Sequence, residues 1–279
     1  MSIKPAWDWE EQRMTENELR AALAPIRCFL LDMDGTFYLG ENLIEGSLDF
    51  LEKLRQTGRR AMFLTNNSSH SSAFYRARLE RMGVPEDFRN ILTSAQATAR
   101  YIVSEYPGKS VYLLANRDAT AEMRALGLTI DENHPDMVLI AFDTELDYRK
   151  MTAVCDFVRA GLPYIATHPD FNCPTETGFI PDIGAIIAFI KASTGREPDE
   201  IIGKPYAGIV RESLRVTGEE TGALAMVGDR LYTDIATGVN FGMTSVLVMS
   251  GETTEDMRLA SPIKPTLTFG RLADMIPYL

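Results

Sequence analysis

The chain reads CFLLDMDGT at residues 28–36, and this stretch decides how the rest of the sequence is interpreted. The four apolar residues at 28–31 are typical of a buried strand, and the carboxylates of Asp32 and Asp34 follow directly. Side chains two residues apart on a strand point to the same side, so two like charges would lie together at the strand end. Such a pair raises the pKa of its members and favours a bound cation. Taken alone, the stretch is also compatible with an acidic β-turn after a core strand.

Strands and helices alternate along the chain on both sides of a middle segment. The early part predicts strands at 28–31, 61–65 and 91–93, with helices at 47–56 and 71–82. The late part predicts strands at 201–202, 223–227 and 245–249, with helices at 209–216 and 235–240. This rhythm indicates an α/β fold with a parallel sheet covered by helices.

The middle segment carries a complete set of elements of its own. It predicts strands at 110–115, 137–142 and 163–167, with helices at 119–126 and 148–160. We therefore expect a second α/β unit, residues 106–183, inserted into a discontinuous core of residues 25–105 and 184–279. Residues 1–24 are predicted to form an extension. In it, Thr15 caps a short helix, and Trp7 and Trp9 pack against the core.

Composition and charge exclude several kinds of partner. The 279 residues are 45% hydrophobic and 24% charged, which is typical of a globular protein of one large domain or two joined ones. A net charge of −11 argues against nucleic acid or an anionic membrane surface as the main partner. Any anionic substrate must therefore be attracted locally, through a metal, a lysine or backbone N–H groups.

The sequence lacks the patterns of a membrane span, a signal peptide and a disulfide framework. No stretch approaches the ~18 apolar residues of a membrane span, and residues 1–16 lack an apolar signal core, so we expect a cytoplasmic protein. The cysteines, Cys28, Cys155 and Cys173, are odd in number and widely spaced. They imply neither a disulfide framework nor a zinc site.

Three further polar motifs follow predicted strands. They are TNNS at 65–68, GKP at 203–205, and GDR at 228–230 followed by TDI at 233–235. Each alone is also compatible with an ordinary turn or a solvated loop. Parallel α/β sheets bind ligands at the carboxyl ends of their strands, where all of these motifs would lie. Their joint occurrence in this order indicates one shared site.

This set of motifs resembles the haloacid dehalogenase superfamily of phosphotransferases. The long insert resembles the type IIA, C2-capped branch, which comprises NagD-like and 4-nitrophenylphosphatase-like phosphatases. Two segments, ATHPD at 166–170 and GFIP at 178–181 with Gly184-Ala185, add to this likeness, which covers about residues 26–275. The resemblance implies a Rossmann-like parallel-sheet core with an inserted α/β cap of the C2 type.

The resemblance also implies a role for each acidic residue. Asp32 matches the nucleophile that forms an aspartyl-phosphate, and Asp34 matches the general acid that later serves as the base. A divalent cation must offset the repulsion between carboxylate and phosphate, and Mg²⁺ is expected because the ligands are hard oxygens. Asp32, the main-chain carbonyl of Asp34 and Asp229 match its ligands. Asp234 matches the acid that orients the water shell of the metal or Lys204.

Phosphate-binding and substrate residues follow from the same likeness. Thr65 and the N–H groups of Gly35 and Asn66 match donors to the phosphoryl oxygens, and Lys204 matches the ammonium that offsets their charge. The candidates for substrate contact are His168, Asp170, Asn172 and Arg230. His168 is also compatible with a role in holding its turn, and Arg230 with a surface salt bridge.

The function that this implies is hydrolysis of small phosphate monoesters, since a cap of this size shields the site. Sugar, polyol and nucleotide phosphates are compatible substrates, and p-nitrophenyl phosphate is the expected artificial one. A phosphomutase or phosphotransferase acting on sugar phosphates is an alternative, because Asp34 would serve both reactions. A non-catalytic protein that binds phosphorylated metabolites is a further alternative. A homodimer is compatible with this branch.

Overall fold

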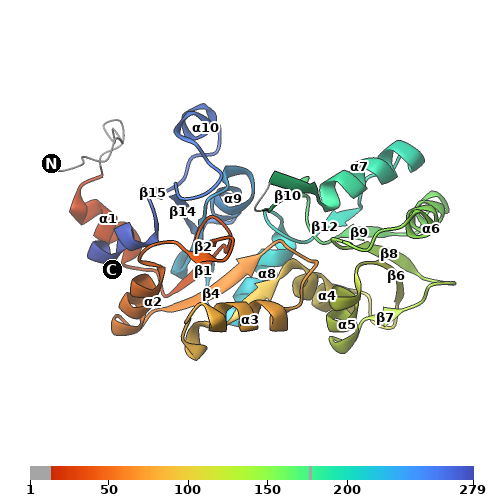
Figure 1. Cartoon of the computed structure of the whole chain (residues 1–279), viewed down its shortest axis with the longest axis horizontal. Coiled ribbons are helices and arrows are strands. Elements are labelled where there is room, and N and C mark those ends of the chain that lie inside the picture. Colours follow the sequence, from red (N-terminus) through yellow and green to blue (C-terminus); the bar gives the residue numbers. More distant parts are fainter. Residues whose placement is uncertain (1–13, 176–177) are drawn as a thin grey trace.

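The structure, a computed structural model, describes residues 14–175 and 178–279 and contains two helix-covered parallel sheets that lie side by side (Figure 1). The larger sheet has six strands in the order β15-β14-β13-β1-β4-β5. Its strands are β1 (Cys28–Leu31), β4 (Arg60–Thr65), β5 (Ile91–Thr93), β13 (Leu224–Gly228), β14 (Thr244–Val248) and β15 (Leu267–Phe269). The expected parallel α/β core is confirmed.

Strand β1 lies in the middle of this sheet, and its register sets the position of the motifs. Leu31 is the register partner of Val227 on one side and of Phe63 on the other. The three strands therefore end at the same edge. Asp32 follows β1 there, close to the ends of β4 and β13.

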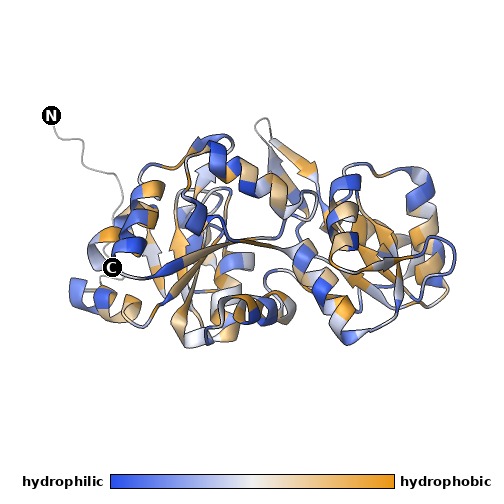
Figure 2. Ribbon diagram, turned by 90° about the horizontal axis from the view of Figure 1, so that it is seen from below, coloured by the Kyte–Doolittle hydropathy of each residue, from blue (hydrophilic) through white to orange (hydrophobic). Residues whose placement is uncertain are grey.

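Alternation along the strands builds the core on the two faces of the sheet. Phe29 and Leu31 join one apolar cluster, and Cys28 and Leu30 join the other. Helices cover both faces, and Figure 2 shows the apolar strands enclosed between them. These helices are α1 (Glu16–Leu23), α2 (Ser47–Gln56), α3 (Ser72–Arg81), α4 (Ser94–Glu105), α8 (Ala207–Thr217) and α9 (Ala236–Phe241).

The second sheet has five strands in the order β12-β9-β8-β6-β7, and every pair in it is parallel. Its strands are β6 (Ser110–Leu114), β7 (Thr129–Ile130), β8 (Met137–Ile140), β9 (Tyr164–Ala166) and β12 (Glu200–Ile201). Its helices are α5 (Arg117–Ala125), α6 (Tyr148–Arg159) and α7 (Ile183–Thr194). We call this unit, residues 106–201, the cap.

The end of the cap differs from the expected boundary at residue 183. Helix α7 packs on the cap through Ile183, Ile187 and Ile190, and β12 pairs with β9 rather than joining the core sheet. The sequence could not distinguish the two arrangements, because a two-residue strand has no periodicity and an almost wholly apolar helix fits either unit.

The cap and core share one apolar cluster. Leu139 and Ile165 of the cap sheet belong to the cluster that also contains Ile102 of α4 and Leu30 of the core sheet. Helix α4, which the sequence analysis did not predict, packs against both α5 and α8. The two units are thus joined by buried side chains as well as by the chain itself.

Two of the elements that the sequence did not predict, α4 and α7, are helices of twelve residues, and the others are short. Two are hairpins, β2–β3 (Tyr38–Leu39 and Asn42–Leu43) and β10–β11 (Asn172–Thr175 and Gly178–Pro181). The expected N-terminal helix is confirmed as α1, with Thr15 and Glu18 forming a capping box. The expected packing of Trp7 and Trp9 lies outside the described residues. None of the helices formed by residues 14–175 and 178–279 combines the length and the hydropathy of a membrane-spanning segment.

Helix α9 contacts β14 so closely that only glycine fits at the crossing. A Cβ at Gly238 would lie 2.6 Å from the Cβ of Ser245 and 3.0 Å from its Cα. Gly238→Ala should therefore lower the free energy of unfolding by about 1–3 kcal/mol, as overpacking does. Urea unfolding measures this, with Gly222→Ala as control, because a Cβ at that exposed glycine meets nothing within 4 Å. Equal stability of the two variants would contradict the close contact.

Candidate active site

Three carboxylates converge at the carboxyl edge of the core sheet. Asp32 follows β1, Asp229 follows β13, and Asp234 lies in a π-helical turn, η3 (Leu231–Ile235). Oxygen atoms of the three groups lie within 4.8 Å of one another. Glycines permit this approach: a Cβ at Gly35 would lie 2.4 Å from Asp229 Oδ2, and one at Gly228 would lie 2.2 Å from Asp234 Cγ.

Lys204 links two of these carboxylates. Its Nζ donates to Asp32 Oδ1 and to Asp234 Oδ1, both at 2.6 Å, and to the carbonyl of Leu64 at 3.1 Å. The side chain is almost fully buried. Burial alone would lower the pKa of Lys204, but Asp234 and Asp32 outweigh it and raise the pKa. The lysine is therefore a permanent cation with all three of its donors satisfied.

The remaining carboxylate has the features of a cation ligand. Asp229 Oδ2 accepts a hydrogen bond from the amide of Glu252 at 2.6 Å, whereas Oδ1 is buried and has no partner. Burial raises the pKa of Asp229, and the charges of Asp32 and Asp234 raise it further. Lys204 is hydrogen-bonded to two of the three carboxylates, and Arg230, whose charge also acts on them, is paired with Glu252 at 2.9 Å. The two cations therefore do not offset all the carboxylates present. A divalent cation with oxygen ligands fits this donor set.

Asp34 lies beside this cluster, at the wall of a cavity. Burial and the charge of Asp32 raise its pKa, which favours the protonated carboxyl. Arg78 and Arg230 act in the opposite sense, as does a hydrogen bond from the backbone of Gly40. A carboxyl of raised pKa can donate a proton, as a general acid must.

Asn66 connects three segments of chain through its side chain. Its Oδ1 accepts from the amide of Lys204 at 2.8 Å, and its Nδ2 donates to the Lys204 carbonyl at 3.0 Å. The same Nδ2 lies 3.2 Å from both carboxylate oxygens of Asp170 in the cap. The hydroxyl of Thr65 accepts from the amide of Asn67 at 3.1 Å. From the sequence, a role is expected only for the backbone N–H of Asn66, as a donor to the phosphoryl oxygens.

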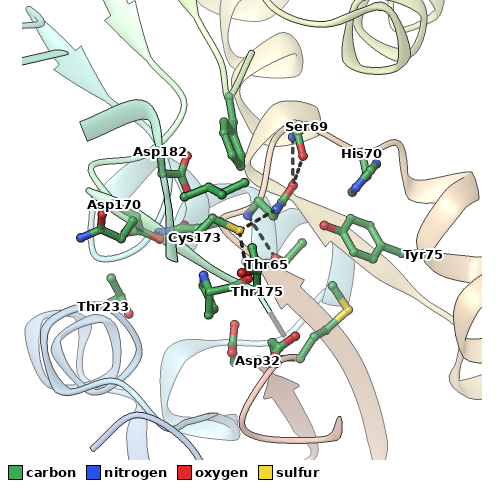
Figure 3. Close-up of a pocket in the computed structure, with 18 of the residues that line it drawn as sticks. Asp32, Thr65, Ser69, His70, Tyr75, Asp170, Cys173, Thr175, Asp182 and Thr233 are labelled. Carbon is green, nitrogen blue, oxygen red and sulfur yellow. Dashed lines mark hydrogen bonds between the residues drawn. The ribbon is translucent and has the colours of Figure 1, made fainter. Parts of the chain in front are cut away.

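The cavity lies between core and cap and encloses about 290 Å³. In Figure 3, Asp32 and Thr65 line its core side, and Asp170, Cys173 and Asp182 approach from the cap. Ser69, His70 and Tyr75 form a third wall, from the loop before α3 and from α3 itself. A volume of this size accommodates a small molecule rather than a folded partner.

The structure separates the four candidates for substrate contact. Asp170, Asn172 and Arg230 line the cavity. His168 does not: its side chain is fully buried, with Nδ1 3.7 Å from Asp170 and Nε2 3.7 Å from Asp182. Burial lowers the pKa of His168 to about 4, so the imidazole is neutral. His168 is therefore not placed to contact substrate as expected. It lies behind Asp170 and Asp182, whose carboxylates line the cavity.

Several lining residues were not predicted from the sequence. They are Tyr38, Tyr75 and Arg78 on the core side and Cys173 and Asp182 on the cap side. Arg78 stands three residues after Tyr75, so it shares the buried face of a predicted helix, and this spacing could have identified it. Asp182 gives no such signal, because its position depends on the β10–β11 hairpin.

Comparison with known families and proteins agrees with this geometry. Residues 29–129 match the haloacid dehalogenase-like hydrolases, and residues 201–275 match a HAD-hydrolase-like family. The acid sugar phosphatase of Staphylococcus aureus strain MRSA252 is 35% identical over 254 residues, covering 91% of this chain and 98% of that relative.

Solved structures show the same likeness. The 4-nitrophenylphosphatase from Thermotoga maritima has a TM-score of 0.88 and 42% identity, covering 92% of this chain and 98% of its own. NagD from E. coli K-12 has a TM-score of 0.82 and 30% identity, and the match covers 89% of this chain and 98% of the NagD chain. The chain therefore belongs to the haloacid dehalogenase-like hydrolases, and it is a phosphatase of their NagD-like, 4-nitrophenylphosphatase-like branch.

Proposed function

We propose that this phosphatase hydrolyses small organic phosphate monoesters through an aspartyl-phosphate on Asp32, with Mg²⁺ as its metal. The observation that carries the proposal is the contact of Lys204 with Asp32 and Asp234 beside the unpartnered oxygen of Asp229. Sugar, polyol and nucleotide phosphates are the proposed substrates, with p-nitrophenyl phosphate as the artificial one. The names of the relatives, acid sugar phosphatase and 4-nitrophenylphosphatase, support this range.

In the first step, a carboxylate oxygen of Asp32 attacks phosphorus in line with the ester oxygen. The bond from phosphorus to the ester oxygen breaks, and the departing oxygen takes the proton of Asp34. Lys204 offsets the charge of nucleophile and phosphoryl group, and Thr65 with the N–H group of Asn66 is proposed to hold the phosphoryl oxygens. The N–H of Gly35, expected from the sequence as a further donor, donates to the carbonyl of Tyr38 at 2.8 Å instead. Mg²⁺, held by Asp32, the Asp34 carbonyl and Asp229 with support from Asp234, would neutralise the phosphoryl charge.

In the second step, Asp34 is a carboxylate and takes a proton from water. The water oxygen bonds to phosphorus, the acyl-phosphate bond breaks, and inorganic phosphate leaves with Asp32 regenerated. Asp170 and Asn172 of the cap and Arg230 of the core are proposed to contact the rest of the substrate. The homodimer and the cytoplasmic location stay predictions.

Metal removal tests the proposed cofactor. A panel of p-nitrophenyl phosphate, glucose 6-phosphate, glycerol 3-phosphate and AMP should release phosphate with Mg²⁺, lose this activity with EDTA, and regain it when Mg²⁺ is added back. Mg²⁺ should also raise the melting temperature of the wild type, because it binds the folded state. Asp229→Asn should abolish that rise. Full activity after exhaustive EDTA treatment would rule out the metal, and an isomerised sugar phosphate would indicate transfer instead of hydrolysis.

Asp32→Asn tests the nucleophile. The amide is nearly isosteric but does not attack phosphorus, so turnover should fall by at least about three orders of magnitude. Circular dichroism should show an unchanged fold. Asp256→Asn, on exposed helix α10 (Glu255–Ala260), is the matched control and should keep full activity. An active Asp32→Asn variant would show that another group attacks.

Asp34→Asn tests the acid. Sugar alkoxides need protonation to depart, whereas p-nitrophenolate is a stable anion, so kcat/KM should fall by about 10²–10⁴ for the sugar ester and by less for the aryl ester. Steady-state phosphate release on both esters measures this. Equal losses on the two esters would remove Asp34 from the role of acid.

A further inference from the structure

Arg78 of α3 holds the hairpin that follows Asp34. Its Nη2 donates to the carbonyl of Gly40 at 2.5 Å and pairs with Glu41 Oε1 at 2.9 Å. Its guanidinium carbon lies 4.4 Å from the centre of the Tyr38 ring. The three partners belong to the β2–β3 hairpin or its turn, so one side chain contacts both the strand and the tip.

The hairpin needs such a contact. Each of its strands has two residues, and a ladder of that size is marginal in water without outside support. The hairpin is tied to Asp34 at its base, because Asp34 forms a β-bridge with Tyr38 and the amide of Gly35 donates to the Tyr38 carbonyl at 2.8 Å. Movement of the hairpin therefore moves the segment that carries Asp34.

Gly40 makes this connection specific to the carboxyl of Asp34. The backbone of Gly40 hydrogen-bonds that carboxyl, and its carbonyl accepts from Arg78. Arg78, Gly40 and Asp34 thus form a chain of contacts from helix α3 to the acid. Arg78 also lines the cavity, and its side chain is only 16% exposed, so water competes little for the guanidinium.

We infer that Arg78 is a positioning residue, which places the carboxyl of Asp34 for proton transfer by fixing Gly40 and the β2–β3 hairpin. The inference rests on the proposed function, because it requires Asp34 to be the acid. Arg78 forms no bond to the reacting atoms in this account. Its loss should leave attack by Asp32 intact and should impair departure of those leaving groups that need a proton.

The test compares two esters in Arg78→Met. We define the leaving-group ratio as kcat/KM for p-nitrophenyl phosphate divided by kcat/KM for the fastest alkyl ester of the panel. A smaller fraction of folded protein, or a weaker general attraction for phosphate esters, lowers kcat/KM for both esters equally and leaves this ratio unchanged. The value of kcat/KM reports the step in which the ester bond breaks. The ratio should rise at least about tenfold, since a displaced acid loses part of its 10²–10⁴ contribution.

Arg76→Met is the matched control, because Arg76 lies exposed on the same helix and carries the same charge. Its ratio should equal that of the wild type. An unchanged ratio in folded Arg78→Met would overturn the inference, as would equal losses on both esters. If Arg78→Met does not fold, Arg78→Lys decides. A single ammonium does not replace every contact, so the ratio should rise about threefold or more, and a wild-type ratio would overturn the inference. A wild type inactive on every ester would instead refute the proposed function.

Discussion

The ion pairs of Lys204 with Asp32 and Asp234 are the interaction on which the site depends. Like carboxylates do not crowd together at the end of a sheet unless positive charge is supplied at short range. The ammonium supplies part of it and arrives from the segment after β12, at the boundary of the cap. Lys204 follows the last cap strand by three residues, so the same contact fixes the point where the chain returns from cap to core directly beside Asp32.

Glycines beside the carboxylates make their close approach sterically possible. Gly35, Gly228 and Gly251 present no side chain toward Asp229 and Asp234, so the carboxylates approach the main chain closely. Asn66 adds a second link, because its amide satisfies both the N–H and the carbonyl of Lys204 while reaching Asp170. Asn66, expected from the sequence to act only through its backbone N–H, thus also acts through its side chain.

The sequence predicts well those parts of the structure that local pattern controls. Periodicity and capping chemistry predict the strand before Asp32, the motif after β4 and the capped helix α1. The motifs contain the residues that lie together in the structure. Tertiary contacts decide the rest. The pairing of β12 with β9 depends on two residues without a pattern, and the burial of His168 depends on a packing arrangement that no neighbour in sequence reveals. Arg78 has a helical signal for burial but none for its contact with Gly40.

The apolar cluster shared by cap and core limits how the enzyme exchanges its small molecules with solvent. Lifting the cap as a rigid lid would expose side chains such as Leu139 and Ile102, each at a cost of about 1.5–3 kcal/mol. Exposing only these two would leave about one molecule in a hundred, or fewer, open at equilibrium. Exchange past the β10–β11 hairpin, where Ile180 lines the cavity and is exposed to solvent, would not carry this cost.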